Sequence, residues 1–151
     1  MRTEFRKAVI PDELRTLCAF DRKVFPADYF PPSEWKGYES YWLILGARKK
    51  IGCCAFEKQG DTLYIATTGI LPAFQRLGFG GLMKAWQIAW ARRNKFKRLI
   101  AHTRKSNAAM IALNKKFGFR QVKTIPHYYE DPDESAVVME IRLEKTAAPE
   151  T

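Results

Sequence analysis

The chain has 151 residues, of which 46% are hydrophobic and 13% aromatic, so it can form one core without disulfide or metal staples and is not a disordered chain. No apolar run approaches the roughly 20 residues of a membrane-spanning helix, and the first residues lack the apolar segment of a signal peptide, so we expect a cytoplasmic protein without a membrane partner. The net charge of +10 predicts attraction to polyanions, such as nucleic acid, a ribosome surface or a phosphorylated cofactor.

The domain organisation is simple, because no repeat, low-complexity stretch or linker divides the sequence. We expect one domain over residues 1–144 and a polar tail over residues 145–151. The three cysteines include no CxxC pair, and their odd number does not suit a disulfide framework. We therefore expect small buried thiols and no metal site.

The first half of the chain is rich in β-forming residues. They predict four strands, at residues 4–10, 41–47, 51–58 and 62–70. Between the first two strands, Pro11 is placed as the first residue of an amphipathic helix that ends near Phe25. The turn at residues 59–61 contains Gly60 and joins the last two strands as a hairpin, which predicts an antiparallel meander.

Beyond Pro72 the hydrophobic period changes to that of a helix. A long helix is expected to run to about Asn94, with one face made of Leu82, Met83, Trp86, Ala89, Trp90 and Arg93. This face is better explained as core than as a stacking platform for nucleic-acid bases, and no RNA-recognition pattern accompanies it.

The remaining elements alternate between strand and helix. A buried strand at 98–103 is followed by a helix that Ser106 can cap and that stops at Gly118. Two last strands, 119–128 and 136–143, flank an acidic loop at 130–134. The element order predicts an α/β (α+β) fold with a mixed, mostly antiparallel sheet and helices on both faces.

A dense basic run lies at the end of the long helix and contains Arg92, Arg93, Lys95, Lys97 and Arg98. Cations at this place also stabilise the helix dipole, so a solvated helix end explains the run. The alternative is a surface that associates with the ribosome or with RNA without sequence specificity.

The turn before the long helix is rich in glycine and reads Gln75-Arg76-Leu77-Gly78-Phe79-Gly80-Gly81. Glycines leave backbone N–H groups free to approach an anion at a helix N-terminus, which makes this turn a candidate pyrophosphate cradle. It matches neither GxGxxG nor GxxxxGK[ST], so dinucleotide and P-loop readings are weak. A plain tight turn would also explain the glycines.

Two motifs resemble those of the GCN5-related N-acetyltransferase (GNAT) superfamily. Gln75-x-x-Gly78-x-Gly80 is similar to its Q/R-x-x-G-x-G/A signature, and residues 106–119 resemble its SNxxAxxLYxxxGF element. The resemblance covers nearly the whole chain. It implies a sheet with splayed central parallel strands, acetyl-coenzyme A (acetyl-CoA) as the donor, and direct attack by an amine without an acyl-enzyme.

The same resemblance implies residues that hold the cofactor. The amides of residues 77–81 would bind pyrophosphate, next to Gln75 and Arg76; Ile70 would pair with pantetheine through its backbone, and Asn107 would contact the cofactor arm. Asn114 stands where the family usually has a Tyr that contacts or protonates the departing thiolate. The general acid is therefore left open, because a thiolate near a helix N-terminus can also leave unprotonated.

A narrower resemblance points to catalytic subunits that acetylate protein N-termini, especially the NatE class, and to ribosomal-protein alanine acetyltransferases. Residues 63–67 (LYIAT) resemble the NatE "LYIMTL" strand, and residues 101–107 (AHTRKSN) resemble its "LHVxxSN" strand. By this similarity Tyr64 and His102 position a water that removes a proton from the amine. Without the resemblance, each would be explained as a packed core residue.

The substrate side carries similar matches. The loop Phe25-Pro26-Ala27-Asp28-Tyr29 resembles the "FPVxY" substrate loop of this subgroup, and Tyr128-Tyr129 resembles its "NYY" segment beside the peptide. Ala27 replaces a larger aliphatic residue and Asp28 adds a charge. We therefore expect a wider pocket that prefers a side chain other than Met.

Three classes of function remain open from the sequence. The first is acetylation of a peptide N-terminus, whose amine has a pKa near 8 and needs little help from a neutral imidazole such as His102, whereas a Lys amine near 10.4 needs more. The second is acetylation of a small amine such as a polyamine or an aminoglycoside, which the acidic loop at 130–134 would attract. The third is a non-catalytic acyl-CoA or nucleic-acid binding module.

Overall fold

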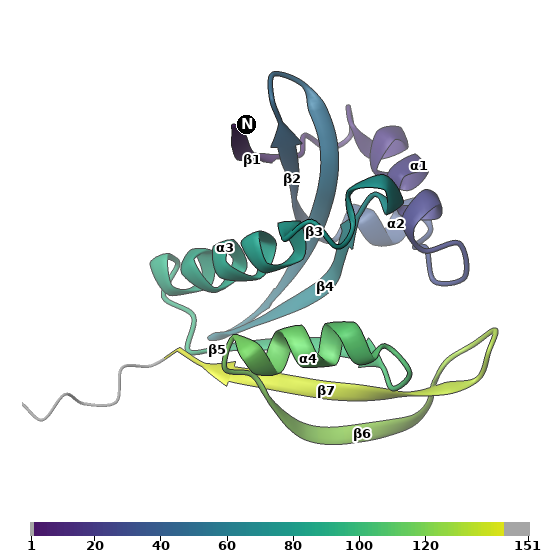
Figure 1. The fold of residues 1–151 in the computed structure, drawn as a ribbon, viewed down its shortest axis with the longest axis vertical. Helices are drawn as coiled ribbons and strands as arrows, with labels where there is room; N and C mark the ends of the chain where they lie inside the picture. Colours follow the sequence, from purple (N-terminus) through teal and green to yellow (C-terminus); the bar gives the residue numbers. More distant parts are fainter. Residues whose placement is uncertain (1, 144–151) are drawn as a thin grey trace, which may run out of the picture.

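In the computed structural model, residues 2–143 form one seven-stranded sheet with helices on both faces (Figure 1). The strand order is β1-β2-β3-β4-β5-β7-β6, with bounds β1 Thr3–Lys7, β2 Glu39–Leu45, β3 Lys49–Gln59, β4 Thr62–Ile70, β5 Arg98–Arg104, β6 Arg120–Tyr129 and β7 Glu134–Arg142. The helices are α1 Leu14–Val24, α2 Pro32–Trp35, α3 Phe79–Arg93 and α4 Ala108–Lys116, with a 3₁₀ turn at Pro72–Phe74. The tail expected at 145–151 lies outside the described residues.

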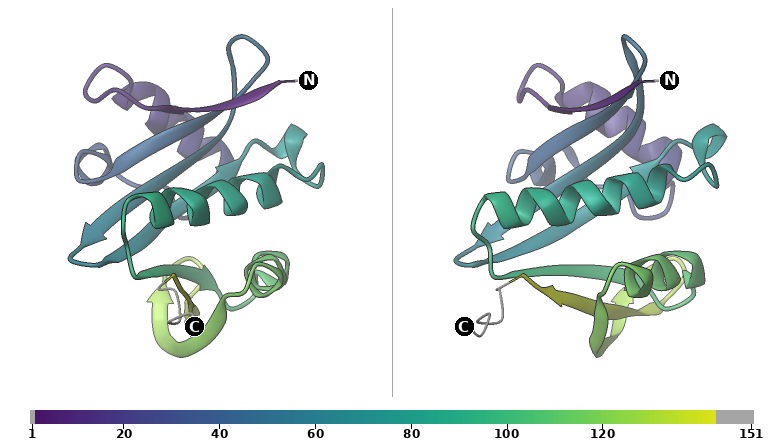
Figure 2. Two further views of the ribbon diagram at one scale, coloured as in Figure 1. Left: turned by 90° about the vertical axis from the view of Figure 1, so that its left-hand side faces the viewer. Right: turned by 60° about the vertical axis from the view of Figure 1, so that its left-hand side comes forward.

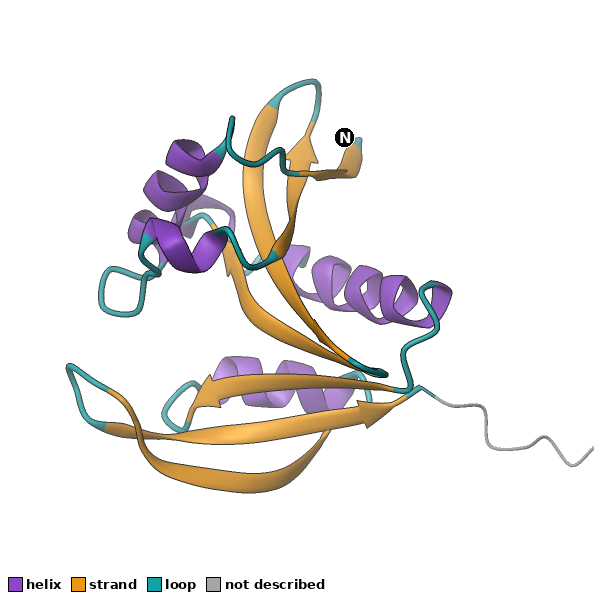
Figure 3. Cartoon of the chain, turned by 180° about the vertical axis from the view of Figure 1, so that it is seen from behind, coloured by secondary structure: helices purple, strands orange, loops and turns teal. Residues whose placement is uncertain are grey.

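The predicted mixed and mostly antiparallel sheet is confirmed. Every strand pair is antiparallel except β4 and β5, which run parallel from the pair Thr62 and Arg98 to the pair Ile65 and Ala101. After these residues the ladder between the two strands stops, and the two halves of the sheet separate (Figure 3). A parallel pair needs a long crossover, which α3 provides. The expected splayed central strands are therefore present.

Alternation along the strands divides the apolar side chains between two cores. On β2, the fully buried Trp42 and Leu43 are neighbours in sequence and pack into opposite cores. One core lies under α3 and α4, and the other lies under α1 and α2 (Figure 2). The sheet is thus covered on both faces, as the element order predicts.

The buried face of α3 differs from the predicted one. Trp90 is buried and stacks on Phe56 with ring centroids 4.6 Å apart, so its core role is confirmed. However, Leu82 and Ala89 are exposed, while Lys84 and Gln87 are buried. The hydropathy pattern missed this face because two polar side chains occupy it.

Several element ends also differ from the prediction. α1 begins at Leu14 and not at Pro11, because Val9 and Glu13 form a turn in which the Val9 amide donates to the Glu13 carboxylate at 2.9 Å. β1 ends at Lys7. Asn107, not Ser106, caps α4, since its side chain accepts from the Met110 amide at 3.2 Å. Among residues 2–143, every helix is too short or too polar to span a bilayer.

Candidate functional site

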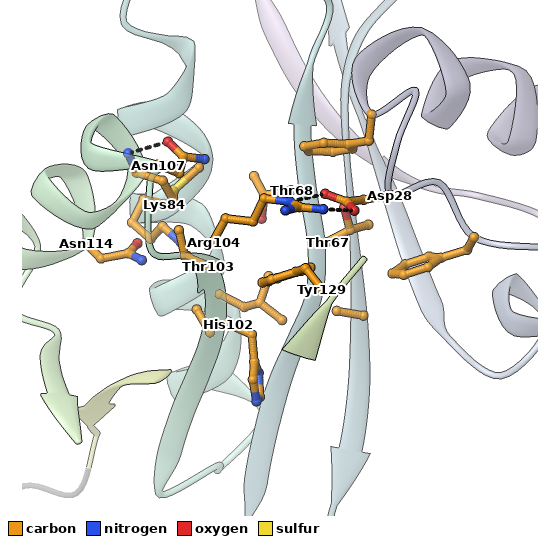
Figure 4. A pocket seen from close by; sticks show the side chains of 16 residues that line it. Asp28, Thr67, Thr68, Lys84, His102, Thr103, Arg104, Asn107, Asn114 and Tyr129 are labelled. Carbon is orange, nitrogen blue, oxygen red and sulfur yellow. Dashed lines mark hydrogen bonds and ion pairs between the residues drawn. The ribbon is translucent and has the colours of Figure 1, made fainter. Parts of the chain in front are cut away.

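A cavity of about 220 Å³ opens where β4 and β5 separate (Figure 4). Residues 65–68 of β4 and 101–104 of β5 form two of its walls. The others come from α3, α4, β6 and the α1–α2 loop, with Lys84, Asn107, Met110, Asn114, Tyr129, Phe25, Asp28 and Phe30. The cavity lies where the β4–β5 ladder has stopped, because the two strands diverge after Ile65 and Ala101 and leave a hollow between them.

His102 stands on the β5 wall and is the histidine of this cavity. Its ring lies nearly parallel to that of Tyr128, with centroids 5.3 Å apart, and to that of Tyr64, with centroids 6.3 Å apart. Burial lowers the pKa of His102 below its usual value, and the positive charge of Lys123 lowers it further. The imidazole is therefore neutral at neutral pH and can accept a proton.

Tyr128 reaches His102 because β6 is irregular. The pairing of β6 with β7 shifts between Ile125 and Tyr129, and His127 adopts a positive φ of 56° within this segment. Such a bulge re-aims the side chains of a strand. The sequence signal for this bulge is the Pro126-His127 pair, which prevents a regular ladder there.

Arg104, at the end of β5, is one of the residues of this site that the sequence did not single out. Its Nε and Nη2 atoms donate to the two carboxylate oxygens of Asp28, both at 2.8 Å. The same guanidinium donates to the carbonyls of Glu130 and Pro132 and to the carboxylate of Glu134, at 2.8, 2.9 and 3.0 Å. Arg104 thus ties the α1–α2 loop and the β6–β7 loop together across the cavity (Figure 4).

This network changes two expectations about charge. Asp28 does not offer a free charge to a substrate pocket, because its carboxylate is committed to Arg104. In the loop at 130–134, Glu134 is the first residue of β7 and also accepts from the Ser106 amide, and Asp133 contacts the His127 ring at 2.9 Å. Two of the four acidic side chains of the loop, Asp133 and Glu134, are therefore engaged within the protein, whereas those of Glu130 and Asp131 are exposed.

The glycine-rich turn leads into the N-terminus of α3. Gly78 is the N-cap residue with φ of 91°, a conformation that L residues rarely adopt, and no side chain caps the helix. The first-turn amides of Phe79, Gly80 and Gly81 thus have no acceptor inside the helix. On the approach to this turn, Gln75 donates its side-chain amide to the Ile70 carbonyl at 2.9 Å, which fixes the turn to the end of β4.

Lys84 and Asn114 form a buried polar corner of the cavity, on α3 and α4 (Figure 4). Asn114 is completely buried; its Nδ2 donates weakly to the Met139 sulfur at 3.6 Å, and its Oδ1 has no partner among the described residues. Lys84 is 1% exposed, and burial lowers its pKa to about 8. Buried polar groups normally find a partner, so this corner has unused hydrogen-bonding capacity.

The structure brings some of the predicted site residues together and leaves others apart. Five line the cavity: Phe25, His102, Asn107, Asn114 and Tyr129. Tyr64 and Tyr128 lie beside His102 without lining the cavity. The rest of the substrate loop, Pro26, Ala27 and Tyr29, is exposed outside the cavity lining.

The basic run at the end of α3 is not a single surface. Lys97 pairs with Asp61 at 4.0 Å, and Arg98 belongs to β5, where it pairs with Glu140 at 3.2 Å. Arg92, Arg93 and Lys95 remain exposed at the helix end. The explanation of the basic run as a solvated helix end therefore applies only to these three residues.

Comparisons with known proteins agree with this architecture. The model of the Acetyltransferase (GNAT) family matches residues 11–119. The chain is 32% identical over 152 residues to the probable N-acetyltransferase san of Drosophila melanogaster. The aligned region covers 92% of this chain and 80% of the relative. It is 26% identical over 155 residues to N-alpha-acetyltransferase 50 of Danio rerio, with coverage of 93% and 89%.

A similar solved structure is the ribosomal-protein-S18-alanine N-acetyltransferase from Escherichia coli. It matches with a TM-score of 0.86 over 98% of both chains, at 18% sequence identity. This likeness shows the fold that surrounds the cavity.

Proposed function

We propose that this chain, which belongs to the acetyltransferase (GNAT) family and is an N-acetyltransferase, acetylates the α-amine of a protein or peptide N-terminus. One observation carries the proposal: a neutral, half-buried His102 stands in the wall of the cavity between the splayed strands, beside Tyr64 and Tyr128. The names of the two relatives, an N-acetyltransferase and an N-alpha-acetyltransferase, support it.

The residues present fit acetyl-CoA, the donor of this family. The uncapped first turn of α3 offers the amides of Phe79, Gly80 and Gly81 to the pyrophosphate, and the positive φ of Gly78 sets their direction. From there the arm can follow β4 past Ile70 into the cavity, where Asn107 and Asn114 present amide groups. Bound in this way, acetyl-CoA supplies an acetyl group activated as a thioester.

His102 acts on the incoming amine. An α-amine with a pKa near 8 is mostly protonated at neutral pH and must lose one proton before it can attack, at a cost of about 1 kcal/mol. The neutral imidazole accepts this proton through a water, and Tyr64 and Tyr128 hold the imidazole and water in place. The lowered pKa of His102 makes it a weak base, which suffices for an α-amine but not for a Lys side chain.

The acceptor approaches between the two loops that Arg104 ties together. Phe25 and Phe30 present aromatic surface on one side, and Tyr129 lies on the other. The Arg104 guanidinium stacks over the Tyr129 ring, with 4.6 Å between the guanidinium carbon and the ring centroid. An extended peptide end can place its first side chain against the aromatic surface and its backbone against the tyrosines. The pairing of Glu134 with Arg104 leaves one carboxylate fewer for a polycationic small amine.

The test compares acceptors directly. The protein is incubated with acetyl-CoA and a library of short peptides with free N-termini, and in parallel with polyamines and aminoglycosides, and products are read by mass spectrometry. We expect acetylation at peptide α-amines and none at internal Lys side chains. Turnover of the small amines alone would replace the peptide acceptor by the small-amine alternative.

A further inference from the structure

Lys84 is a buried cation without a counter-ion among residues 2–143. It lies on α3, six residues after the N-cap Gly78, and its side chain is 1% exposed. The titratable neighbour that faces it is Cys54 of β3, a completely buried thiol whose pKa burial raises to about 12. This thiol is neutral at any physiological pH, so it does not balance the charge of Lys84.

The surroundings of Lys84 do not explain why a lysine is there. Its Nζ lies 5.1 Å from the ring centroid of Phe119, and its neighbours on α3 and α4 include the buried Gln87 and Asn114, each with one unpartnered side-chain oxygen. Burying an unpaired charge is unfavourable, and an apolar side chain of similar size would avoid that cost. A lysine in these surroundings is suited to meet a negative charge that forms only during the reaction.

The lining of the cavity indicates where that negative charge would form. Lys84 lines the same hollow as His102, from the opposite side, together with Asn107 and Asn114 of α4 (Figure 4). When an amine attacks the thioester carbonyl on the His102 side, the electron pair of the broken C–S bond goes to sulfur. A cofactor whose pyrophosphate is held at the N-terminus of α3 would place its sulfur on the side of the cavity that α3 and α4 form.

We propose that Lys84 is the proton donor to the sulfur of coenzyme A. The neutral amine nitrogen forms the new bond to the acetyl carbon and gives up one proton through water on the His102 side, while the C–S bond breaks and its electron pair takes a proton from Nζ of Lys84. The products are the amide, the thiol of coenzyme A and a neutral Lys84, which regains a proton from solvent. This step rests on acetyl transfer by the chain and not on which amine accepts the acetyl group.

The chemistry of the corner agrees with this role. A donor is most effective when its pKa is close to that of its acceptor, and the pKa of Lys84, about 8, is close to that of a thiol near 8.5. Asn114 cannot replace it, because a side-chain amide is no acid in this range. Lys84 is thus the candidate donor on this side of the cavity.

Binding tests the proposal without any acceptor. Calorimetry at pH about 7.5, where Lys84 is mostly an ammonium, compares coenzyme A with an analogue in which hydrogen replaces the thiol, for wild type, Lys84→Met, Lys84→Arg and the control Lys7→Met on strand β1. Wild type and Lys7→Met should prefer coenzyme A by roughly 10-fold, because its sulfur accepts a hydrogen bond from the ammonium that the analogue cannot accept. Lys84→Met should lose this preference, whereas a purely structural lysine would change both affinities equally.

Kinetics separates charge from proton donation. Lys84→Met should lower kcat by roughly 10²-fold with little change in KM for acetyl-CoA. Lys84→Arg keeps the charge but cannot release a proton. It should therefore keep the preference for coenzyme A over the analogue but have a kcat as low as that of Lys84→Met. Because Met suits a buried site, Lys84→Met should unfold at the same or a higher temperature than wild type.

Three results would overturn the proposal. The first is that Lys84→Met keeps the wild-type preference for coenzyme A over the analogue. The second is that Lys84→Met keeps the wild-type kcat. The third is a mass spectrum that shows an acetyl group on Lys84 during turnover, which would make it a nucleophile and not an acid. A failure of peptide acetylation in the acceptor test leaves the binding comparison unaffected, so the two proposals fail separately.

Discussion

Asp28 and Arg104 are 76 positions apart in sequence and meet in a two-pronged ion pair, with both N···O distances at 2.8 Å. The pair joins the α1–α2 loop to the end of β5, at the point where the sheet has already opened. The remaining N–H groups of the guanidinium donate to the carbonyls of Glu130 and Pro132 and to the carboxylate of Glu134, so every N–H has an acceptor. Asp28 thereby holds one wall of the cavity at a fixed distance from the other.

Arg104→Met should loosen this connection. The Arg104 side chain is only 15% exposed, but most of the acceptors it leaves lie at the surface and can bind water, so we expect a loss of roughly 2 kcal/mol in unfolding free energy, about that of one hydrogen bond to a charged group. Once both loops move, KM for the acceptor should rise about 10-fold while the affinity for acetyl-CoA stays near wild type. Denaturant unfolding and acceptor kinetics measure the two effects.

The matched control for that variant is Arg6→Met, since Arg6 pairs with Glu13 at 3.5 Å on the exposed strand β1. Exposed ion pairs contribute less than about 1 kcal/mol, so Arg6→Met should leave KM unchanged. Equal effects of the two variants on KM would show that Arg104 does not position the acceptor walls.

His102→Ala should lower kcat/KM for a peptide acceptor by roughly 10²-fold, and raising the pH should restore part of it, because more of the α-amine is then already neutral. On the acid side, activity of the wild type should be retained down to the ordinary histidine pKa of about 6.5, since the pKa of His102 is lowered and protonation at still lower pH removes the base.

The chain supplies an internal control for His102. His127, the other histidine, is exposed and contacts Asp133. His127→Ala should keep wild-type turnover and the wild-type pH profile. If His102→Ala retained full activity at neutral pH, the proton-removal step would have to be assigned to another group.

Much of the fold could be predicted because its signals are local. Strand alternation, the hairpin at Gly60 and the glycine-rich turn before α3 each depend on neighbouring residues. His102 and Tyr64 were identified on strands, and a parallel pair puts strands joined by one helix side by side.

The rest depended on contacts between distant residues. Lys84 looks like a solvent-exposed helix residue until the fold places it against Cys54 and Phe119. Arg104 stands among basic residues with no local sign of its partner Asp28. Polar residues inside a cavity contradict the hydropathy pattern, and the pattern is therefore least informative at the site itself.

Gly78→Ala should weaken acetyl-CoA binding. Gly78 has φ of 91°, where a Cβ is strained by about 1–2 kcal/mol, and relief of that strain would turn the first-turn amides of α3 away from the pyrophosphate. We expect the Kd for acetyl-CoA to rise about 10-fold by calorimetry. Gly60→Ala, in the β3–β4 hairpin with φ of 61°, carries a similar strain and should leave this Kd unchanged. A wild-type Kd in Gly78→Ala would remove the turn from the cofactor site.

Asp21→Asn should change how stability depends on pH. Asp21 is buried on α1, accepts from the Phe30 amide at 2.8 Å, and has its pKa raised by burial to about 6. In the unfolded chain the same carboxyl has a pKa near 3.9, so the unfolded state ionises first as the pH rises. The unfolding free energy of the wild type therefore falls between about pH 4 and pH 6. The stabilising contribution of the neutral Asp21 carboxyl is present in full only below about pH 4.

An Asn at position 21 stays neutral and can still accept from Phe30 through its side-chain oxygen. The difference in unfolding free energy between Asp21→Asn and wild type should thus shift by roughly 3 kcal/mol in favour of the variant from pH 4 to pH 6, and stay constant above. Denaturant unfolding of both proteins across this range measures the difference, in which the other carboxylates cancel. A difference that is flat with pH would mean that Asp21 is ionised at the same pH in the folded and unfolded chains.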